Sequence, residues 1–263
     1  MSVIKVPTMA EMMAEGKTPD VLFWVGCAGS FDQRAQKITK AFVKILHHFN
    51  IDYAVLGGEE MCTGDPARRS GNEMVFQMMA QQNIAILNGY EVKKIVTACP
   101  HCFNTLKNEY PELGGKYEVI HHTQFLQKLI DEGKISLKGG GTFKGKHITF
   151  HDSCYLGRAN DEFEAPRFLL EKLDAELVEM KRSRENGMCC GAGGAQIFKE
   201  PEKGDAEVHF ERADQAMETG SKIIAASCPY CTLMITDGVK NREKEDEVQV
   251  LDVAELIAQA EDL

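Results

Sequence analysis

The sequence lacks the features that would place the protein in a membrane or on a nucleic acid. No stretch of its 263 residues approaches the roughly 18 apolar residues of a transmembrane helix. Residues 1–20 have no basic start followed by an apolar core, as a secretory signal would. Basic residues are outnumbered by acidic ones, 30 against 40, so the charge expected of a nucleic-acid-binding protein is missing. We therefore expect a soluble cytoplasmic protein without a membrane span of its own that binds no nucleic acid.

Cysteine is plentiful, with nine residues in the chain. An odd number, with two of them adjacent as Cys189 and Cys190, does not suit a secreted disulfide framework. A reducing compartment would instead keep the cysteines available as thiolates for a metal, which agrees with a cytoplasmic location.

The cysteines form two sets with nearly the same spacing. The first set contains Cys27, Cys62, Cys99 and Cys102, and the second contains Cys154, Cys189, Cys190, Cys228 and Cys231. The first set maps onto the second by shifts of 127 (27→154, 62→189) and 129 (99→228, 102→231). Only Cys190 has no counterpart, because Thr63 occupies its place in the first half. Such self-similarity indicates an internal repeat, and two cysteine sets that each close with C-P-x-C make metal or cluster ligation the first hypothesis.

The hydrophobic pattern predicts the same order of strands and helices in both halves. Strands are predicted at 21–25, 53–56, 94–97, 119–121, 147–151, 176–180, 222–227 and 248–251. Helices are predicted at 32–49, 72–87, 123–130, 162–172, 206–219 and 252–260. Alternating strands and helices favour an α/β fold with parallel sheets, whose ligands gather at the carboxyl ends of the strands.

We expect two pseudo-symmetric lobes, each a small parallel sheet flanked by helices, with the cysteines at the carboxyl ends of the strands. The predicted division is an N-terminal extension at 1–20, a first repeat at 21–138 and a second repeat at 139–263. The boundary lies in the glycine-rich stretch 133–146, which includes Gly139 and Gly140.

Each C-P-x-C motif predicts the start of a helix. Pro100 and Pro229 suit the first helical position, so Cys99 and Cys228 are expected to be N-caps. The positive end of the helix dipole favours the thiolate there. Small residues beside the cysteines would let backbone N–H groups approach the sulfur atoms of a cluster. These small residues are Gly26 and Gly29 in the first half and Gly191, Ala192, Gly193 and Gly194 in the second.

The residues alone leave two questions open. Four thiolates in the first set also suit a structural zinc ion, which takes four cysteines tetrahedrally. His101 lies inside the first C-P-x-C, and His151 lies three residues before Cys154. Both histidines are expected to serve as hydrogen-bond donors beside the site or as packing residues rather than as ligands.

The pattern C-x(34)-C-C-G followed by C-P-x-C resembles the cysteine-rich CCG domain found in the B and D subunits of heterodisulfide reductase. Four stretches, at 62–73, 99–111, 151–158 and 188–194, look closest to the CCG region of the iron-sulfur oxidoreductases that link electron-transfer flavoprotein to menaquinone. The resemblance spans residues 20–260 and implies a stand-alone CCG subunit whose membrane and ferredoxin-type parts lie on another polypeptide.

The resemblance also implies roles for the cysteines. It assigns Cys154, Cys189, Cys190, Cys228 and Cys231 to a noncubane [4Fe-4S] cluster, which would be the active centre. Because the first set lacks a fifth cysteine, Cys27, Cys62, Cys99 and Cys102 are expected to hold a conventional [4Fe-4S] cluster or zinc. Gly191, Gly193 and Gly194 are expected to contact the second cluster.

Three functions follow as hypotheses. The first is an electron-transfer subunit between a flavoprotein, with electron-transfer flavoprotein preferred, and a quinone-reducing membrane partner that would hold the protein peripherally at the inner face of the membrane. The second is a heterodisulfide-reductase-type subunit that reduces a small-molecule disulfide. The third is a zinc-bearing structural module without a redox role.

Overall fold

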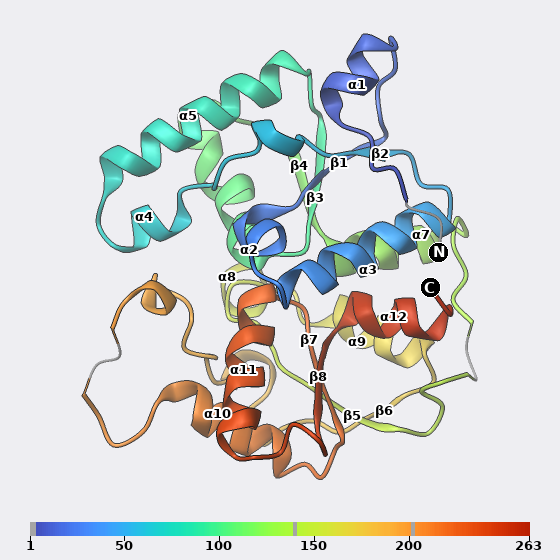
Figure 1. Cartoon of the computed structure of the whole chain (residues 1–263), viewed down its shortest axis with the longest axis vertical. Helices are drawn as coiled ribbons and strands as arrows, with labels where there is room; N and C mark the ends of the chain where they lie inside the picture. The colour runs from blue at the N-terminus through green and yellow to red at the C-terminus, as the bar shows by residue number, and fades with distance from the viewer. Residues whose placement is uncertain (1–3, 139–140, 201–202) are drawn as a thin grey trace.

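The computed structural model describes residues 4–138, 141–200 and 203–263, and it contains two four-stranded parallel sheets (Figure 1). The strand orders are β2-β1-β3-β4 and β6-β5-β7-β8, so the two sheets share one topology. The strands are β1 Val21–Trp24, β2 Tyr53–Ala54, β3 Lys94–Thr97, β4 Glu118–His121, β5 His147–Phe150, β6 Glu176–Leu177, β7 Ile223–Ala226 and β8 Gln249–Asp252. The predicted α/β fold with two lobes is confirmed.

All eight predicted strands are present. Three of them, β1, β5 and β7, are one or two residues shorter than predicted, and two are much shorter. β2 and β6 each have two residues where 53–56 and 176–180 were predicted. Both lie at the edge of their sheet, and Val55, the residue after β2, forms only an isolated bridge with Thr8. A strand in the middle of a sheet gains backbone hydrogen bonds on both sides, and an edge strand has half of that support.

The predicted helices are also present, with one correction near the first cysteine. The long helices are α3 Ala35–His48, α5 Glu73–Gly89, α7 His122–Asp131, α9 Glu164–Lys172, α10 Val208–Met217, α11 Pro229–Asn241 and α12 Val253–Ala260. The single helix predicted at 32–49 is divided: Asp32 separates a short helix α2 (Gly26–Phe31) from α3. The Asp32 carboxylate accepts hydrogen bonds from the backbone N–H groups of Arg34 and Ala35, and it thereby begins the second helix.

Among the short helices, only the start of α6 (Pro100–Asn104) at Cys99 was predicted from the sequence. The short helices are α1 Met9–Ala14, α2, α4 Asp65–Arg69, α6 and α8 Gly157–Asn160. Single turns occur at Gly57–Glu59, Thr105–Glu109, Tyr110–Leu113, Arg184–Asn186 and Gln196–Phe198. Segments of four to six residues are too short to show a helical period. No helix of the described ranges has the length and apolar character that crossing a bilayer requires.

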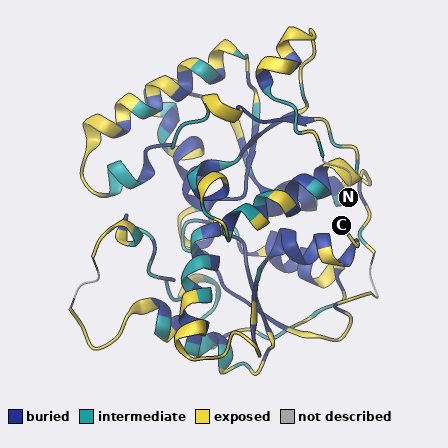
Figure 2. Ribbon diagram, viewed as in Figure 1, coloured by how far each residue is buried: buried dark blue, intermediate teal, exposed yellow. Residues whose placement is uncertain are grey.

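The two lobes share one hydrophobic core. The largest buried cluster contains Phe23 and Phe42 of the first repeat together with Phe150 and Ile257 of the second. Helix α3 packs on α12, and α7 packs on α9, so each lobe contributes one helix to each of two equivalent contacts (Figure 1). Figure 2 shows these central helices buried along their facing sides, whereas the outer side of α5 is exposed. The predicted boundary at 138/139 stays a prediction, and Gly139 and Gly140 lie outside the described residues.

Polar groups also cross between the lobes. The guanidinium of Arg34 donates to both carboxylate oxygens of Glu255 at 2.9 and 2.7 Å and to the carbonyl of Val250 at 2.7 Å. The buried His122 Nε2 lies 3.0 Å from the Asp252 carboxylate. These contacts are largely hidden from water, so they help to fix one orientation of the lobes.

Candidate metal centre

The sheets bring the cysteines to the carboxyl ends of their strands, as predicted. Cys27 follows β1, and Cys99 and Cys228 follow β3 and β7 directly. Cys62 and Cys189 lie farther along, 8 residues after β2 (62−54) and 12 residues after β6 (189−177), in the loops that return toward the same edge.

Both C-P-x-C motifs form the predicted helix starts. Cys99 and Cys228 are N-caps with extended backbones, and Pro100 and Pro229 occupy the first helical turn. All four C-P-x-C sulfurs are buried. The first turns of α6 and α11 therefore surround thiols with backbone dipoles and little water, which favours thiolates once a positive metal centre is present.

The thiols of the first set contact one another in pairs. Contact with Cys62 lowers the pKa of Cys27 to about 6, against the opposing effect of burial. Contacts with Cys102 and with Cys228 lower the pKa of Cys99 well below its ordinary value. The pKa values of the paired thiols Cys62 and Cys102 shift upward instead, because these thiols donate to their deprotonated neighbours. The sulfur atoms of each pair therefore lie close together.

The second set forms a continuous chain of sulfur contacts. Cys189 contacts both Cys154 and Cys190. These two contacts lower the pKa of Cys189 strongly, and the contact with Cys154 has the larger effect. Cys190 contacts Cys231, which in turn contacts Cys228. All five cysteines assigned to the active centre are therefore brought together by the fold.

The two sets also face each other. The hydroxyl of Tyr230, from the second C-P-x-C, lies 3.1 Å from the sulfur of Cys27 in the first set. His101, from the first C-P-x-C, contacts Cys228 as well as Cys99. Burial lowers the pKa of His101, but these two thiols outweigh it and raise the pKa well above its ordinary value. The x residue of each motif therefore reaches the other repeat.

Aromatic rings lie at the junction, the place where the two cysteine sets face each other. The His101 ring lies 4.5 Å from the ring of Tyr155 and 5.3 Å from that of Tyr230, measured between centroids. Tyr155 follows Cys154 directly in the sequence. Sequence reasoning missed both tyrosines, because their place depends on contacts between residues of different repeats.

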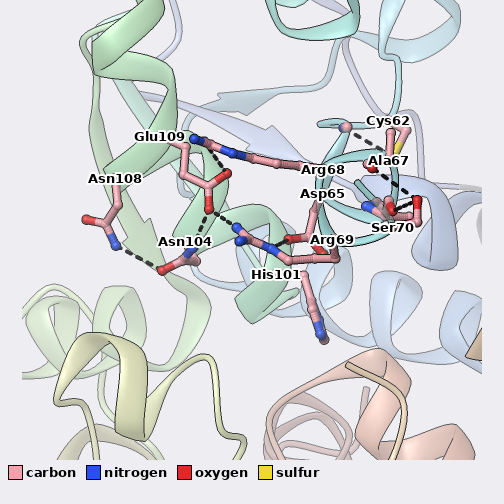
Figure 3. Close-up of polar contacts among 12 residues, drawn as sticks. Cys62, Asp65, Ala67, Arg68, Arg69, Ser70, His101, Asn104, Asn108 and Glu109 are labelled. Carbon is pink, nitrogen blue, oxygen red and sulfur yellow. Dashed lines mark hydrogen bonds and ion pairs between the residues drawn. The ribbon is translucent and has the colours of Figure 1, made fainter. Parts of the chain in front are cut away.

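A network of hydrogen bonds and ion pairs connects helices α4 and α6 beside the first cysteine set (Figure 3). Arg68 and Arg69 of α4 both donate to the carboxylate of Glu109, and Arg69 also donates to Asp65 at 3.0 Å. Asn104 at the end of α6 donates to the same Glu109 carboxylate at 3.1 Å. The network joins the loop that carries Cys62 to the C-P-x-C helix, so it holds the two parts of the first set in register.

The glycines named in the sequence differ in what they face. A Cβ on Gly26, whose φ is +78°, would lie 3.2 Å from the Cys102 sulfur. A Cβ on Gly29 would instead lie 2.6 Å from the Thr39 hydroxyl, so Gly29 allows α2 to pack on α3. Gly191 and Gly194 adopt positive φ, at +91° and +68°. Gly193 lies beside Tyr155 and His101, because a Cβ there would be 3.7 and 3.8 Å from their rings. The direct contact of Gly191, Gly193 and Gly194 with a cluster stays a prediction.

His151 lies beside the second set, at the end of β5. Its ring nitrogen and the sulfurs of Cys190 and Cys231 all lie within 4.8 Å of one another. Burial first and then the charge of Arg212 lower the pKa of His151 to about 3. The imidazole is therefore neutral. Arg212, whose Nε donates to His151 Nδ1 at 2.9 Å, is a neighbour of the site that the sequence did not indicate.

The residues fit an iron-sulfur centre. Buried thiols in two groups, a glycine whose Cβ would crowd a sulfur, and ring N–H groups without protein partners all suit a sulfur-rich cluster that accepts hydrogen bonds. Among the described residues, the potential metal ligands that lie within 4.8 Å of one another are His151, Cys190 and Cys231. Thiolate ligands select zinc, copper(I) or iron-sulfur clusters over hard cations.

Comparison with known proteins gives two kinds of match. A family model described as the CCG cysteine-rich domain matches the chain twice, over residues 21–107 and 148–236. The chain is 46% identical to the probable iron-sulfur-binding oxidoreductase FadF of Bacillus subtilis, covering 97% of this chain and 36% of that protein. It is 41% identical to the EtfAB:quinone oxidoreductase of Syntrophomonas wolfei, with the same coverage of 97% and 36%.

A third relative is a subunit of a heterodisulfide reductase. The chain is 37% identical to the D subunit of the dihydromethanophenazine:CoB–CoM heterodisulfide reductase of Methanosarcina barkeri, covering 92% of this chain and 59% of that relative. The chain thus spans about a third of the length of the first two relatives and less than two thirds of the third.

Proposed function

Because this chain belongs to the family of proteins built on the CCG cysteine-rich domain, we propose that it is the iron-sulfur electron-transfer subunit of an oxidoreductase complex. It passes electrons between a flavoprotein, for which electron-transfer flavoprotein is the first candidate, and a membrane partner that reduces quinone. The observation that carries this proposal is the meeting of two thiol sets at one place, where Tyr230 touches Cys27 and Cys228 touches Cys99.

The proposal gives each cysteine set its own centre. Cys154, Cys189, Cys190, Cys228 and Cys231 would hold a noncubane [4Fe-4S] cluster, and Cys27, Cys62, Cys99 and Cys102 would hold a [4Fe-4S] cluster. Such clusters accept and release single electrons when bound. Between the two sets, the buried ring of His101 packs against the half-buried rings of Tyr155 and Tyr230.

A second candidate is the reduction of a small-molecule disulfide. It is favoured by the likeness to the heterodisulfide reductase relative and by a cavity of about 830 Å³ beside the second set. Gly191 lines this cavity together with the basic residues Arg34, Lys199 and Lys240. The lining also contains Lys203 and the acidic residues Glu200, Glu207 and Asp237. A cavity of this size suits a small molecule.

Metal analysis of anaerobically purified protein tests both candidates against a zinc-bearing module. We expect a brown protein with about eight iron and eight sulfide per chain, because two [4Fe-4S] clusters contain that many. About four iron and one zinc would assign zinc to the first set and leave the second set intact. A colourless protein with about two zinc would overturn the proposal.

Cys190 provides the sharper test of the noncubane centre. Thr63 is its counterpart and is equally buried, so Cys190→Thr gives the second set the composition of the first. We expect Cys190→Thr and Cys190→Ala to keep the fold and the first centre, to change the paramagnetic signal of the second centre and to lose electron transfer. Wild-type activity with an unchanged signal would show that Cys190 is not a ligand. Electron transfer from reduced electron-transfer flavoprotein, compared with reduction of a small disulfide, separates the two candidates.

A further inference from the structure

His151 and Trp24 occupy the same place in the two repeats. Each lies three residues before the first cysteine of its set. Trp24 pairs with Thr97 in the first sheet, and the shift of 129 maps Thr97 onto Ala226, which is beside His151 at the end of β5. Both side chains are fully buried.

Both side chains also have a buried ring nitrogen without a partner. Trp24 Nε1 and His151 Nε2 make no hydrogen bond to any described residue. An unsatisfied buried N–H group costs about 1–3 kcal/mol, whereas a phenyl ring would fill similar space at no such cost. Indole and imidazole share little besides a ring N–H, so the same position in both repeats is occupied by a donor that needs an acceptor.

Arg212 determines which nitrogen of His151 has the proton. Its Nε–H group lies 2.9 Å from His151 Nδ1. A guanidinium can only donate, so Nδ1 must present its lone pair and the proton must be on Nε2. The same guanidinium donates to the carbonyl of Arg182 at 2.9 Å and to Gln215 at 3.1 Å, so it cannot turn away freely.

The imidazole ring of His151 lies beside two sulfur atoms of the second set. The ligand atoms of His151, Cys190 and Cys231 lie within 4.8 Å of one another, and Cys190 and Cys231 are both buried. A nitrogen that has a proton has no lone pair in the ring plane for a metal. The N–H can instead donate to a thiolate or to a sulfide of the cluster.

We propose that His151 is a positioning residue that donates an Nε2–H hydrogen bond to the second iron-sulfur centre, that Arg212 holds it in the donor tautomer, and that it is not an iron ligand. This inference rests on the proposed function, because it requires the cluster in the second set. Trp24 has the corresponding place at the first set. A hydrogen bond to sulfur stabilises the reduced, more negative cluster more than the oxidised one, so it raises the reduction potential.

Two variants of the holoprotein separate this role from simple packing. His151→Phe retains a flat ring and removes the N–H. His151→Gln retains a donor on its amide nitrogen, and its carbonyl oxygen can still accept from Arg212. Both are purified anaerobically, and their iron content is measured before any other comparison.

We expect both variants to retain the iron of the second set, because its five cysteines are untouched. At a fixed solution potential, the ratio of reduced to oxidised second centre should be about tenfold lower in His151→Phe than in the wild type. This corresponds to a reduction potential lower by about 59 mV for a one-electron couple. An exchangeable proton coupled to the reduced centre in the wild type, detected by comparing H₂O with D₂O, should disappear. His151→Gln should restore the potential and the proton coupling.

Two results would overturn the inference while leaving the proposed function in place. One is an unchanged potential and proton coupling in iron-loaded His151→Phe. The other is a nitrogen coupling in wild-type protein with ¹⁵N-labelled histidine that is as large as that of a directly bound imidazole and is absent from His151→Gln. The wild-type measurement does not depend on the folding of a variant. Failure of the proposed function is distinct, since the wild type itself would then contain no iron.

Discussion

The hydroxyl of Tyr230 lies 3.1 Å from the sulfur of Cys27, although the two residues belong to different repeats. The contact crosses the junction in one direction, and the contact of His101 with Cys228 crosses it in the other. Each C-P-x-C motif therefore supplies two candidate ligands to its own set and one side chain to the other set. This exchange makes the geometry of each cysteine set depend on a side chain of the other repeat.

The first prediction concerns this contact. Tyr230→Phe removes an O–H donor from Cys27, so we expect a chelator to extract iron from the first set about fivefold faster, as the loss of about 1 kcal/mol implies. Absorbance during chelation measures the rate. Tyr155→Phe is the matched control, because the Tyr155 ring packs on the same His101, while its hydroxyl has no hydrogen bond within the described part of the chain. Equal rates for both variants would count against the role of the hydroxyl.

The second prediction concerns the space beside Cys102. Gly26→Ala places a Cβ 3.2 Å from the Cys102 sulfur and forces alanine into a φ of +78°. We expect the variant to lose the first centre, so that iron falls from about eight to about four per chain. Gly16→Ala is the control, since Gly16 has a similar φ of +67° and no atom within 4 Å of its Cβ position. Full iron content in Gly26→Ala would show that the loop can shift to accommodate the added Cβ.

The third prediction concerns the ion pair between the lobes. Arg34→Ala leaves the largely buried Glu255 carboxylate without its cation, so we expect the free energy of unfolding to fall by about 2–3 kcal/mol in urea titrations. Arg242→Ala removes an equally bidentate pair with Asp214 that is exposed and lies within one lobe. That control should lose less stability than Arg34→Ala does, because water and salt screen an exposed ion pair. A similar loss of unfolding free energy in both variants would show that burying the ion pair between the lobes does not increase its contribution to stability.

The fourth prediction concerns pH. Burial first and then His122 lower the pKa of His121 well below its ordinary value of 6.5, so the folded protein leaves this imidazole neutral. Below pH 6.5 the unfolded chain binds a proton that the folded chain does not, and stability therefore falls with falling pH. Each such histidine can contribute up to about 1.4 kcal/mol per pH unit. In urea titrations between pH 6.5 and 5, His121→Asn, which can still cap α7, should show a shallower decline than the wild type. If the unfolding free energy of His121→Asn declined with pH as steeply as that of the wild type, the lowered pKa of His121 would be contradicted.

Local sequence patterns predicted a large part of this fold. They indicated the eight strands, the long helices and the helix starts at Cys99 and Cys228, because strand and helix periods and proline at the first turn act over a few residues. The spacing of the cysteines predicted the repeat, and the resemblance to the CCG family is confirmed by the family model. The other short helices were missed because they are too short to show a helical period. The break at Asp32 was missed because the hydrogen bonds of one side chain decide it.

The way in which the two cysteine sets meet depends on tertiary packing. Tyr230 and Cys27 are 203 residues apart, and no local pattern relates them. Their contact follows from the packing of α3 on α12 and of α7 on α9, which buries one shared core and fixes the orientation of the lobes. The tautomer of His151 likewise depends on Arg212, which α10 places 61 residues farther along the chain. Such relations depend on positions in space rather than on spacing in the chain, because burial and hydrogen bonding act between whichever side chains the packed helices and sheets bring together.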